Sequence, residues 1–308
     1  MDASTNTNAM IRHRRQRYWL GRVATPYIFS APAMSLFFLL MLFPMGMVFR
    51  YSVLDGAILK PAPEFVGVAN FLTLFSDPVF VQSIGNTLYF TVMSVAFHLL
   101  IGLLFALMLN SNRVNGTLRA ILRVLFILPW LFTAVIIAIV WRLILDPNGV
   151  INGYLIALNI IDHKIEWFSS TATAIHALTF VNIWAGYPLY MVSLLAGLQG
   201  IPKELYEAAS LDGANCPNQL WFITLPQLFP IIISIALLDF IWTMQVFPLV
   251  WMTTGGGPIN TTEMLSTYTY KLAFTRYQFS AAAASAVIIF FLSMILTCFY
   301  IMHQRRVR

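Results

Sequence analysis

Polar and aromatic side chains inside two long apolar stretches are the residues of this sequence best suited to bind a solute. Asp239 is the only acidic residue deep inside such a stretch. Aromatic rings stack on the apolar faces of sugars, and carboxylate and amide groups bond hydroxyls, so this set suits a polyhydroxyl solute. The candidate pathway residues are Asn182, Trp184, Tyr187, Tyr190, Asp239, Trp242 and Gln245. The alternative interpretation is that these groups pair with or pack against neighbouring helices.

No pattern typical of catalysis, metal binding or nucleotide binding accompanies these residues. His98 stands alone in an apolar stretch, which favours a packed or hydrogen-bonded helix residue over a metal ligand. Cys216 and Cys298 lie far apart in the sequence and do not have metal-ligand spacing. The sequence contains no Gly-Lys pair and therefore no phosphate-binding Gly-x4-Gly-Lys loop. We expect no catalytic residue, no metal and no cofactor.

The composition of the chain predicts contact with lipid. Of the 308 residues, 59% are hydrophobic and 10% are charged, whereas soluble domains carry roughly 25% charged residues. So little charge cannot cover a globule of this size, and so much apolar sequence excludes a disordered chain. The net charge of +6 does not indicate nucleic-acid binding, because Lys and Arg flank apolar stretches instead of forming one polar face.

Six stretches are long and apolar enough to cross a bilayer as helices, which takes about 20 residues each. The sequence therefore predicts an all-α, polytopic membrane protein with six transmembrane helices. The predicted spans are 27–49, 85–109, 122–145, 172–198, 226–253 and 281–302.

The distribution of basic residues predicts that both chain ends lie in the cytoplasm. Segments rich in Lys and Arg stay on that side of the membrane, and 12 of the 18 basic residues fall in the segments predicted to face it. They are Arg12, Arg14, Arg15, Arg17, Arg22, Arg113, Arg119, Arg123, Lys203, Arg305, Arg306 and Arg308. Ala31-Pro32-Ala33 resembles a signal-peptide cleavage site, but apolar sequence continues well beyond it, which favours a retained span.

The one sizeable loop predicted to be cytoplasmic, 199–225, has the features of a rigid helix-turn-helix. Pro202 suits the first turn of a helix, and Glu204 complements the positive end of its dipole. Gly213 follows where a residue in the left-handed conformation can end the helix, and Pro217 allows a second short helix. The alternative interpretation is an amphipathic linker that lies on the lipid headgroups.

The spacing of residues in this loop resembles the signature of a known family. The fixed positions are Glu207-Ala208-Ala209, Gly213 after three residues, Ile223 after nine more, and Leu225-Pro226. They match without departure the EAA-x3-G-x9-I-x-LP pattern of the inner-membrane permease subunits of binding-protein-dependent ABC importers.

Further runs extend this resemblance over nearly the whole chain and favour the carbohydrate branch, with its maltose-type and glycerol-phosphate-type permeases. The runs include Phe65-Val66-Gly67, Asn70-Phe71, Asp77-Pro78, Asn86-Thr87, Leu128-Pro129-Trp130, Gly149-Val150-Ile151-Asn152, Ala196-Gly197-Leu198 and Thr254-Gly255-Gly256-Gly257-Pro258. The tail 1–22 has no clear counterpart.

The resemblance implies a MetI-like type I importer permease fold, in which a transmembrane domain, 27–303, lies between cytoplasmic tails 1–26 and 304–308. It also implies that the loop 199–225 forms a coupling helix that docks on a cytoplasmic ATPase subunit. The coupling residues would be Glu207, Ala208, Ala209, Asp212 and Gly213. The ATPase subunits, and not this chain, would bind and hydrolyse ATP.

The other implied partners are a second homologous permease subunit, an extracytoplasmic solute-binding protein and membrane lipid. Together they would import a sugar or sugar derivative across the bacterial inner membrane. An ion-coupled secondary transporter or channel is the alternative, and it would be expected to show repeated halves, more buried carboxylates or a filter motif. A membrane-embedded enzyme is a third option, but no His or carboxylate cluster shares a helix face.

Overall fold

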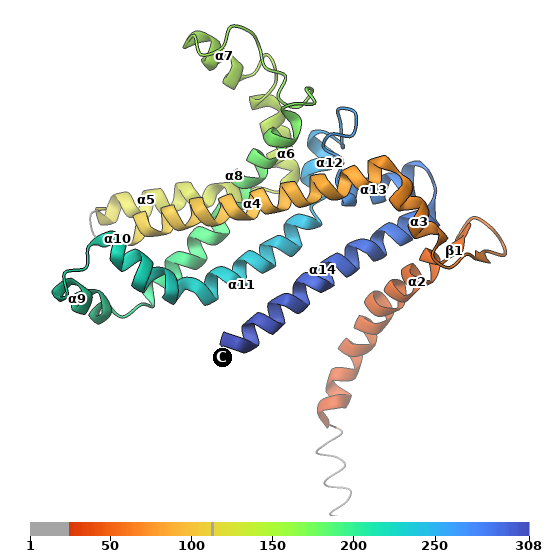
Figure 1. Cartoon of the computed structure of the whole chain (residues 1–308), viewed down its shortest axis with the longest axis horizontal. Helices are drawn as coiled ribbons and strands as arrows, with labels where there is room; N and C mark the ends of the chain where they lie inside the picture. The colour runs from red at the N-terminus through yellow and green to blue at the C-terminus, as the bar shows by residue number, and fades with distance from the viewer. Residues whose placement is uncertain (1–24, 112–113, 308) are drawn as a thin grey trace, which may run out of the picture.

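The computed structural model of the protein describes residues 25–111 and 114–307. These residues are mostly helical, as predicted (Figure 1). A hairpin of two short antiparallel strands, β1 (Leu54–Asp55) and β2 (Glu64–Phe65), departs from the all-α prediction. The Asn70 side chain donates to the carbonyls of Ser52 and Leu54 and so holds this hairpin against the following helix. The predicted basic residues of the N-terminal tail, Arg113 and Arg308 lie outside the described residues.

Helices of very different length make up the chain. The first half contains the helix Thr25–Ser52, which includes the π-helical turn η1 (Phe38–Leu42) and α2 (Phe43–Ser52), followed by α3 (Ala69–Ser76), α4 (Pro78–Asn110), α5 (Gly116–Ile127), the 3-10 turn η2 (Leu128–Leu131), α6 (Ala134–Ile144) and α7 (Val150–Ala157). The second half contains α8 (Ala174–Gln199), α9 (Lys203–Leu211), α10 (Cys216–Gln219), the π-helical turn η3 (Leu220–Thr224), α11 (Leu225–Met244), α12 (Pro248–Thr253), α13 (Leu265–Tyr270), the π-helical turn η4 (Lys271–Thr275) and α14 (Phe279–Val307).

Within the described residues, four helices are long and apolar enough to cross a membrane. They are Thr25–Ser52, Pro78–Asn110, Ala174–Gln199 and Cys216–Met244, and they overlap the first, second, fourth and fifth predicted spans. A bent pair of helices occupies the third predicted span and makes a fifth crossing if the pair is one span. The sixth predicted span falls in α14, where Phe279–Ile295 is described as an apolar helix.

The third predicted span, 122–145, is not one straight helix. The segment Gly116–Leu131 meets α6 at an angle of 101°. Pro129 in η2 has no backbone N–H to donate, and the hydroxyl of Thr133 accepts from the amide of Ile136 at the start of α6. The chain turns inside the predicted span because Pro129 interrupts the first helix and Thr133 caps the start of the next.

The fifth predicted span, 226–253, begins and ends earlier than expected. Its helix runs without a break from α10 through η3 and α11, so the second helix of the loop 199–225 is the base of the span. The helix ends at Met244, and Pro248 starts the separate helix α12. Pro188 and Pro230 lie inside α8 and α11 and do not end them.

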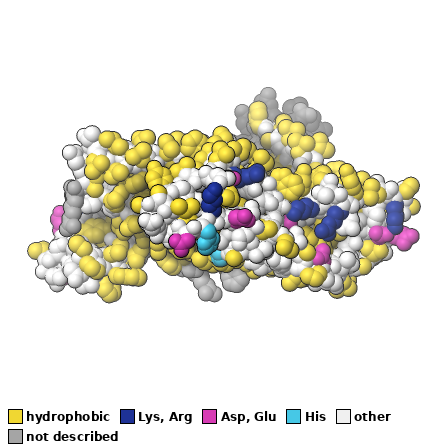
Figure 2. All heavy atoms as spheres, turned by 90° about the horizontal axis from the view of Figure 1, so that it is seen from above, with side chains coloured by type: hydrophobic (Ala, Val, Ile, Leu, Met, Phe, Trp, Pro, Cys, Tyr) yellow, Lys and Arg dark blue, Asp and Glu magenta, His cyan; other side chains and the backbone are white. Residues whose placement is uncertain are grey.

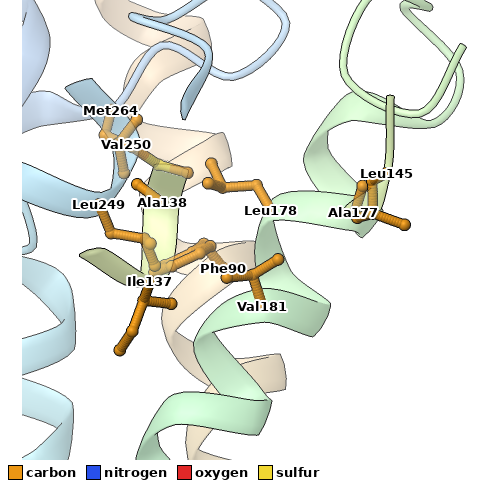
Figure 3. Packing of buried hydrophobic residues seen from close by; sticks show 10 residues of the cluster. All are labelled: Phe90, Ile137, Ala138, Leu145, Ala177, Leu178, Val181, Leu249, Val250 and Met264. Atoms are coloured by element: carbon orange, nitrogen blue, oxygen red, sulfur yellow. The ribbon is translucent and has the colours of Figure 1, made fainter. Parts of the chain in front are cut away.

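The helices α4 and α8 lie side by side along most of their length and run in the same direction (Figure 1). Tyr89 bonds His176 near the start of the pair, and His98 bonds the carbonyl of Asn182 further along. A buried apolar cluster joins α4 and α8 to α6 and α12 (Figure 3). This cluster comprises Phe90, Ile137, Ala138, Leu145, Ala177, Leu178, Val181, Leu249, Val250 and Met264.

The outer surface of the helices is apolar. Hydrophobic side chains cover much of the face in Figure 2, and large apolar residues on the helix Thr25–Ser52, α4 and α5 are exposed. The end of the helix Thr25–Ser52 packs on α14 through the ring of Phe49, whose centroid lies 5.4 Å from that of Phe290. An apolar exterior on membrane-length helices is the surface expected of a chain in contact with lipid.

Candidate functional site

A helical knob, defined as residues 203–219, projects from one end of the helices, opposite the end that carries β1 and α3 (Figure 1). It comprises α9, a tight turn and α10. The amide of Ala214 donates to the carbonyl of Ala209 at 2.9 Å, and that of Gly213 to Ser210 at 3.1 Å. Gly213 has a φ of +81°, so the predicted left-handed end of the helix is confirmed.

Side-chain hydrogen bonds make the helical knob one rigid piece with the span that follows it. The hydroxyl of Tyr206 lies 2.9 Å from that of Thr224 in η3. Gln219 donates to the hydroxyl of Ser210 at 2.9 Å, and Asn215 caps α10 by accepting from the amide of Asn218. The Tyr206 contact thus connects α9 to the base of α11.

The predicted coupling residues lie on the accessible surface of the helical knob. Glu207, Ala208, Asp212 and Gly213 are exposed, whereas Ala209 is half-buried. Sequence reasoning missed Leu211, which is 91% exposed although it is a large apolar residue. Its position directly before Asp212 and Gly213 was the usable signal, because Leu211 shares the exposed end of α9 with these predicted coupling residues.

A second site lies between the membrane-length helices, where the carboxylate of Asp239 accepts hydrogen bonds from three directions. Nδ1 of His98 on α4 lies 2.8 Å from Oδ2 of Asp239, and the hydroxyl of Tyr190 on α8 donates to the same oxygen at 3.0 Å. Thr243, one turn further along α11, donates to Oδ1 at 3.0 Å. Asp239 is 7% exposed and His98 is 1% exposed. The Asp239 carboxylate therefore already has three side-chain hydrogen-bond partners within this chain.

The seven predicted pathway residues do not converge on one place. Asp239 and Tyr190 meet in the buried cluster just described, and Tyr187 is buried with its ring against Phe105. Trp184 packs against Trp141, and the side-chain nitrogen of Asn182 is buried without a hydrogen-bond partner in the described structure. The other two lie at the end of α11 and are exposed, namely Trp242 and Gln245.

A glycine loop, defined as residues 254–263, lies at the end of the molecule opposite the helical knob and is densely bonded. The hydroxyls of Thr254 and Thr262 lie 2.7 Å apart, and Asn86 on α4 donates to the carbonyl of Glu263 at 3.0 Å. Gly256 has a φ of +93°, and a Cβ there would overlap the Glu263 carboxylate, which is buried and paired with Lys271. Position 256 therefore requires glycine, both for its backbone conformation and for the space taken by Glu263.

A depression of about 360 Å³ borders the glycine loop. Arg142, Asp146, Trp167, Thr254 and Pro258 contribute to its lining. A ring, two opposite charges and a hydroxyl in one open depression provide both apolar and polar contacts for a partner or a solute.

Asp77 anchors the start of α4 near this end. Its carboxylate accepts from the amide of Val79 at 2.8 Å and from the hydroxyl of Tyr268 on α13 at 2.7 Å, and Arg276 lies 4.0 Å away. Burial raises the pKa of Asp77, but the Tyr268 and Val79 hydrogen bonds and the Arg276 charge outweigh it and hold the pKa below its ordinary value.

No group of three or more His, Cys, Asp or Glu residues with metal-binding geometry occurs in the part of the chain that the structure describes.

Comparisons with known proteins agree on one family. The family model described as "Binding-protein-dependent transport system inner membrane component" matches residues 98–308. A probable ABC transporter permease protein of Brucella suis biovar 1 is 34% identical over 277 residues, covering 90% of this chain and 95% of the relative. The lactose transport system permease protein of Rhizobium radiobacter is 32% identical over 314 residues, covering 99% of this chain and 100% of the relative.

The fold is also found in a solved structure. A chain of a bacterial ABC transporter involved in the import of the acidic polysaccharide alginate superposes with a TM-score of 0.82 at 24% identity. The superposition covers 95% of this chain and 99% of that one. The chain therefore belongs to the family of binding-protein-dependent transport system inner membrane components, and it is a multi-pass membrane subunit of such a transport system.

Proposed function

We propose that this chain is one permease subunit of an ATP-driven importer that moves a sugar or sugar derivative across the bacterial inner membrane. Family membership supports a transport subunit, and relatives named for lactose and for trehalose and maltose support a carbohydrate solute. The observation that carries the proposal is the helical knob, because its rigid, exposed turn at Gly213 falls at the fixed glycine of the family signature.

The helical knob is the proposed docking site for a cytoplasmic ATPase subunit. Glu207, Ala208, Ala209, Asp212 and Gly213 contact that subunit, and ATP is bound there and not by this chain. The bond between Tyr206 and Thr224 supports this role, because a push on α9 passes directly to the base of α11. Packed elements of this kind switch between discrete arrangements instead of bending continuously.

The solute pathway is proposed to run between this chain and a second, homologous permease. Trp242 and Gln245 are the pathway residues whose exposure supports direct contact with the solute. The amide of Gln245 also donates to the hydroxyl of Ser293 on α14 at 3.2 Å. Asn182, Trp184 and Tyr187 line the neighbouring helix α8, and Asp239 and Tyr190 stand behind them in the buried cluster. A ring beside an amide suits the faces and hydroxyls of a sugar.

The proposed topology has six spans with both termini in the cytoplasm. The proposed crossings are the four long apolar helices, the bent pair as the third crossing in chain order, and α14 as the sixth. The excess of basic residues in alternate segments supports the orientation. The glycine loop and its neighbouring depression then face the outside, where we propose that a solute-binding protein docks and releases the sugar.

Assembly and stimulated ATP hydrolysis test this function. Candidate permease, ATPase and binding-protein genes are sought among the open reading frames that flank the gene of this chain. The tagged chain is then expressed with them, purified in detergent and placed in nanodiscs. We expect the ATPase to copurify and the sugar-loaded binding protein to raise ATP hydrolysis. Purification of the chain as a stable, functional transporter without any nucleotide-binding subunit would favour the ion-coupled alternative instead.

A further inference from the structure

The buried cluster around Asp239 is built from three residue pairs, each four positions apart on a different helix. This spacing places both members of a pair on one helix face. The pairs are His98 with Gly102 on α4, Gly186 with Tyr190 on α8, and Asp239 with Thr243 on α11. We call these six residues the three-helix clamp.

The two glycines of the three-helix clamp make room for the side chains of the facing helix. A Cβ on Gly186 would overlap the imidazole ring of His98. A Cβ on Gly102 would overlap the Cβ of Tyr190 and approach the backbone of Met191 within 2.9 Å. The helices α4 and α8 therefore each contribute one polar ring and one glycine, and each glycine leaves space for the side chain of the facing helix. The close approach of the two helices depends on both glycines.

The hydrogen-bond partners of His98 determine where its protons lie. Nε2 is 3.0 Å from the backbone carbonyl of Asn182, which can only accept, so Nε2 carries a proton. Nδ1 faces Oδ2 of Asp239 at 2.8 Å, and a proton must lie between these two atoms. The pair is either an imidazolium with a carboxylate or a neutral imidazole with a carboxylic acid.

Asp239 has two further hydrogen-bond donors beside His98. The hydroxyl of Tyr190 donates to Oδ2, and that of Thr243 donates to Oδ1. The other three ion pairs of the described residues, Lys60 with Asp55, Lys271 with Glu263 and Arg276 with Asp77, lie outside the four membrane-length helices or at their edge. Ionisable side chains among membrane-length helices are costly to bury, so the pairing of His98 with Asp239 calls for a specific role.

We propose that the three-helix clamp, through an ion pair between His98 and Asp239, fixes α11 to α4 and α8. These two helices then move together with the helical knob. The inference rests on the proposed function of the knob. Asp239 follows Leu225, the first residue of α11, by fourteen positions in the same helix, a rise of about 21 Å. A displacement of the knob reaches α4 and α8 at this point because the clamp bonds α11 to both. His98, Tyr190 and Thr243 are therefore positioning residues.

The test uses paired neutralisation in the assembled complex. His98→Gln leaves a buried carboxylate without its cation, whereas the double variant with Asp239→Asn leaves no charge at all. Breaking one member of a buried pair costs more than removing both charges. We expect the melting temperature of the complex to fall more for His98→Gln than for the double variant. An equal or larger fall for the double variant would overturn the charged pair.

The second readout is the number of ATP molecules hydrolysed per solute imported in proteoliposomes. We expect His98→Gln to raise this ratio about fivefold or more, because it removes the bond that ties α11 to α4. Thr243→Val should raise the ratio less, because the Thr243 bond lies within α11 and only orients the Asp239 carboxylate. The matched control is His176→Gln, which removes a histidine bond between α4 and α8 that does not involve α11, and we expect no change.

The outcomes separate the clamp from the proposed function. Wild-type complex that imports no sugar with ATP and binding protein contradicts the proposed function, while the melting comparison still tests the clamp. If His98→Gln does not assemble, Thr243→Val and Tyr190→Phe keep the charged pair and each remove one hydroxyl bond. An unchanged ratio in both of these variants, with import intact, would overturn the role in coupling.

Discussion

The hydroxyl of Tyr206 lies 2.9 Å from the hydroxyl of Thr224, and this contact joins α9 to the base of α11 across the turn of the helical knob. Thr224 is buried and also donates to the carbonyl of Gln219 at 3.2 Å. The helix that is proposed to receive the push of an ATPase is thus bonded to the span that it must move.

Removing the Tyr206 hydroxyl should weaken this connection without unfolding the protein. Tyr206→Phe keeps the ring and deletes one hydrogen bond with a net value of about 1 kcal/mol. We expect slower import at an unchanged ATPase content. Import rates of Tyr206→Phe, Thr224→Val and the double variant measure the coupling between the two residues. Effects that simply add would contradict a direct connection.

Gly213 is predicted to be needed for its backbone conformation and not for space. Its φ is +81°, and a Cβ there would meet no atom within 4 Å. Gly213→Val should disorder the turn and uncouple ATP hydrolysis from import, while the chain remains in the membrane, at a cost of about 1–2 kcal/mol in the left-handed region. Gly213→Asn is the matched control, because asparagine tolerates this region. Wild-type import by the valine variant would refute the assignment.

The exposed face of the helical knob should decide the affinity for the ATPase. Glu207→Lys reverses a charge that is exposed in this chain, and Leu211→Ser removes an apolar side chain that is 91% exposed. Neither change affects the interior of the protein, so we expect both variants to reach the membrane at normal levels. Both variants should lose import, and Leu211→Ser should also copurify with less ATPase. Lys203→Gln at the start of α9 is an exposed control on the same helix. Normal copurification and import in both variants would place the docking surface elsewhere.

The Asp77 contacts predict a pH dependence at the opposite end of the molecule. Because folding lowers the pKa of Asp77, its contribution to stability is present above the ordinary value of 3.8 and is lost as the pH falls through the lower folded-state pKa. We expect Asp77→Asn to lower the melting temperature at pH 7, and the difference from wild type to shrink below about pH 4. A difference that stays constant from pH 7 to pH 3 would show that the charge of Asp77 does not matter.

The sequence predicted local features of the structure well, because neighbouring residues determine them. Gly213 ends α9 as expected, and four predicted spans overlap four long helices. The loop 199–225 is a helix-turn-helix because a proline starts each of its helices and a glycine separates them. These signals act within one or two helical turns.

Long-range pairing was not predictable in the same way. His98 and Asp239 are 141 positions apart. The sequence suggested a packed or hydrogen-bonded helix residue at position 98, and either a pathway residue or a helix-pairing group at position 239, but it did not pair the two. Glycines 102 and 186 gave no signal, since their purpose is visible only when α4 lies against α8. Prolines 129 and 248 signalled possible bends near Thr133 and Gln245, and the helices do break there. Pro188 and Pro230 carry the same signal but do not end α8 or α11, so a proline in a span does not by itself tell where the chain turns.

The measurement that tests the central claim most directly is uptake of a radiolabelled sugar by proteoliposomes that contain the purified complex. The binding protein is supplied outside, and ATP is sealed inside. The proposed function predicts uptake that requires the binding protein, ATP and the ATPase together, and that Glu207→Lys abolishes. Uptake by this chain without the ATPase, driven by an ion gradient, would contradict it.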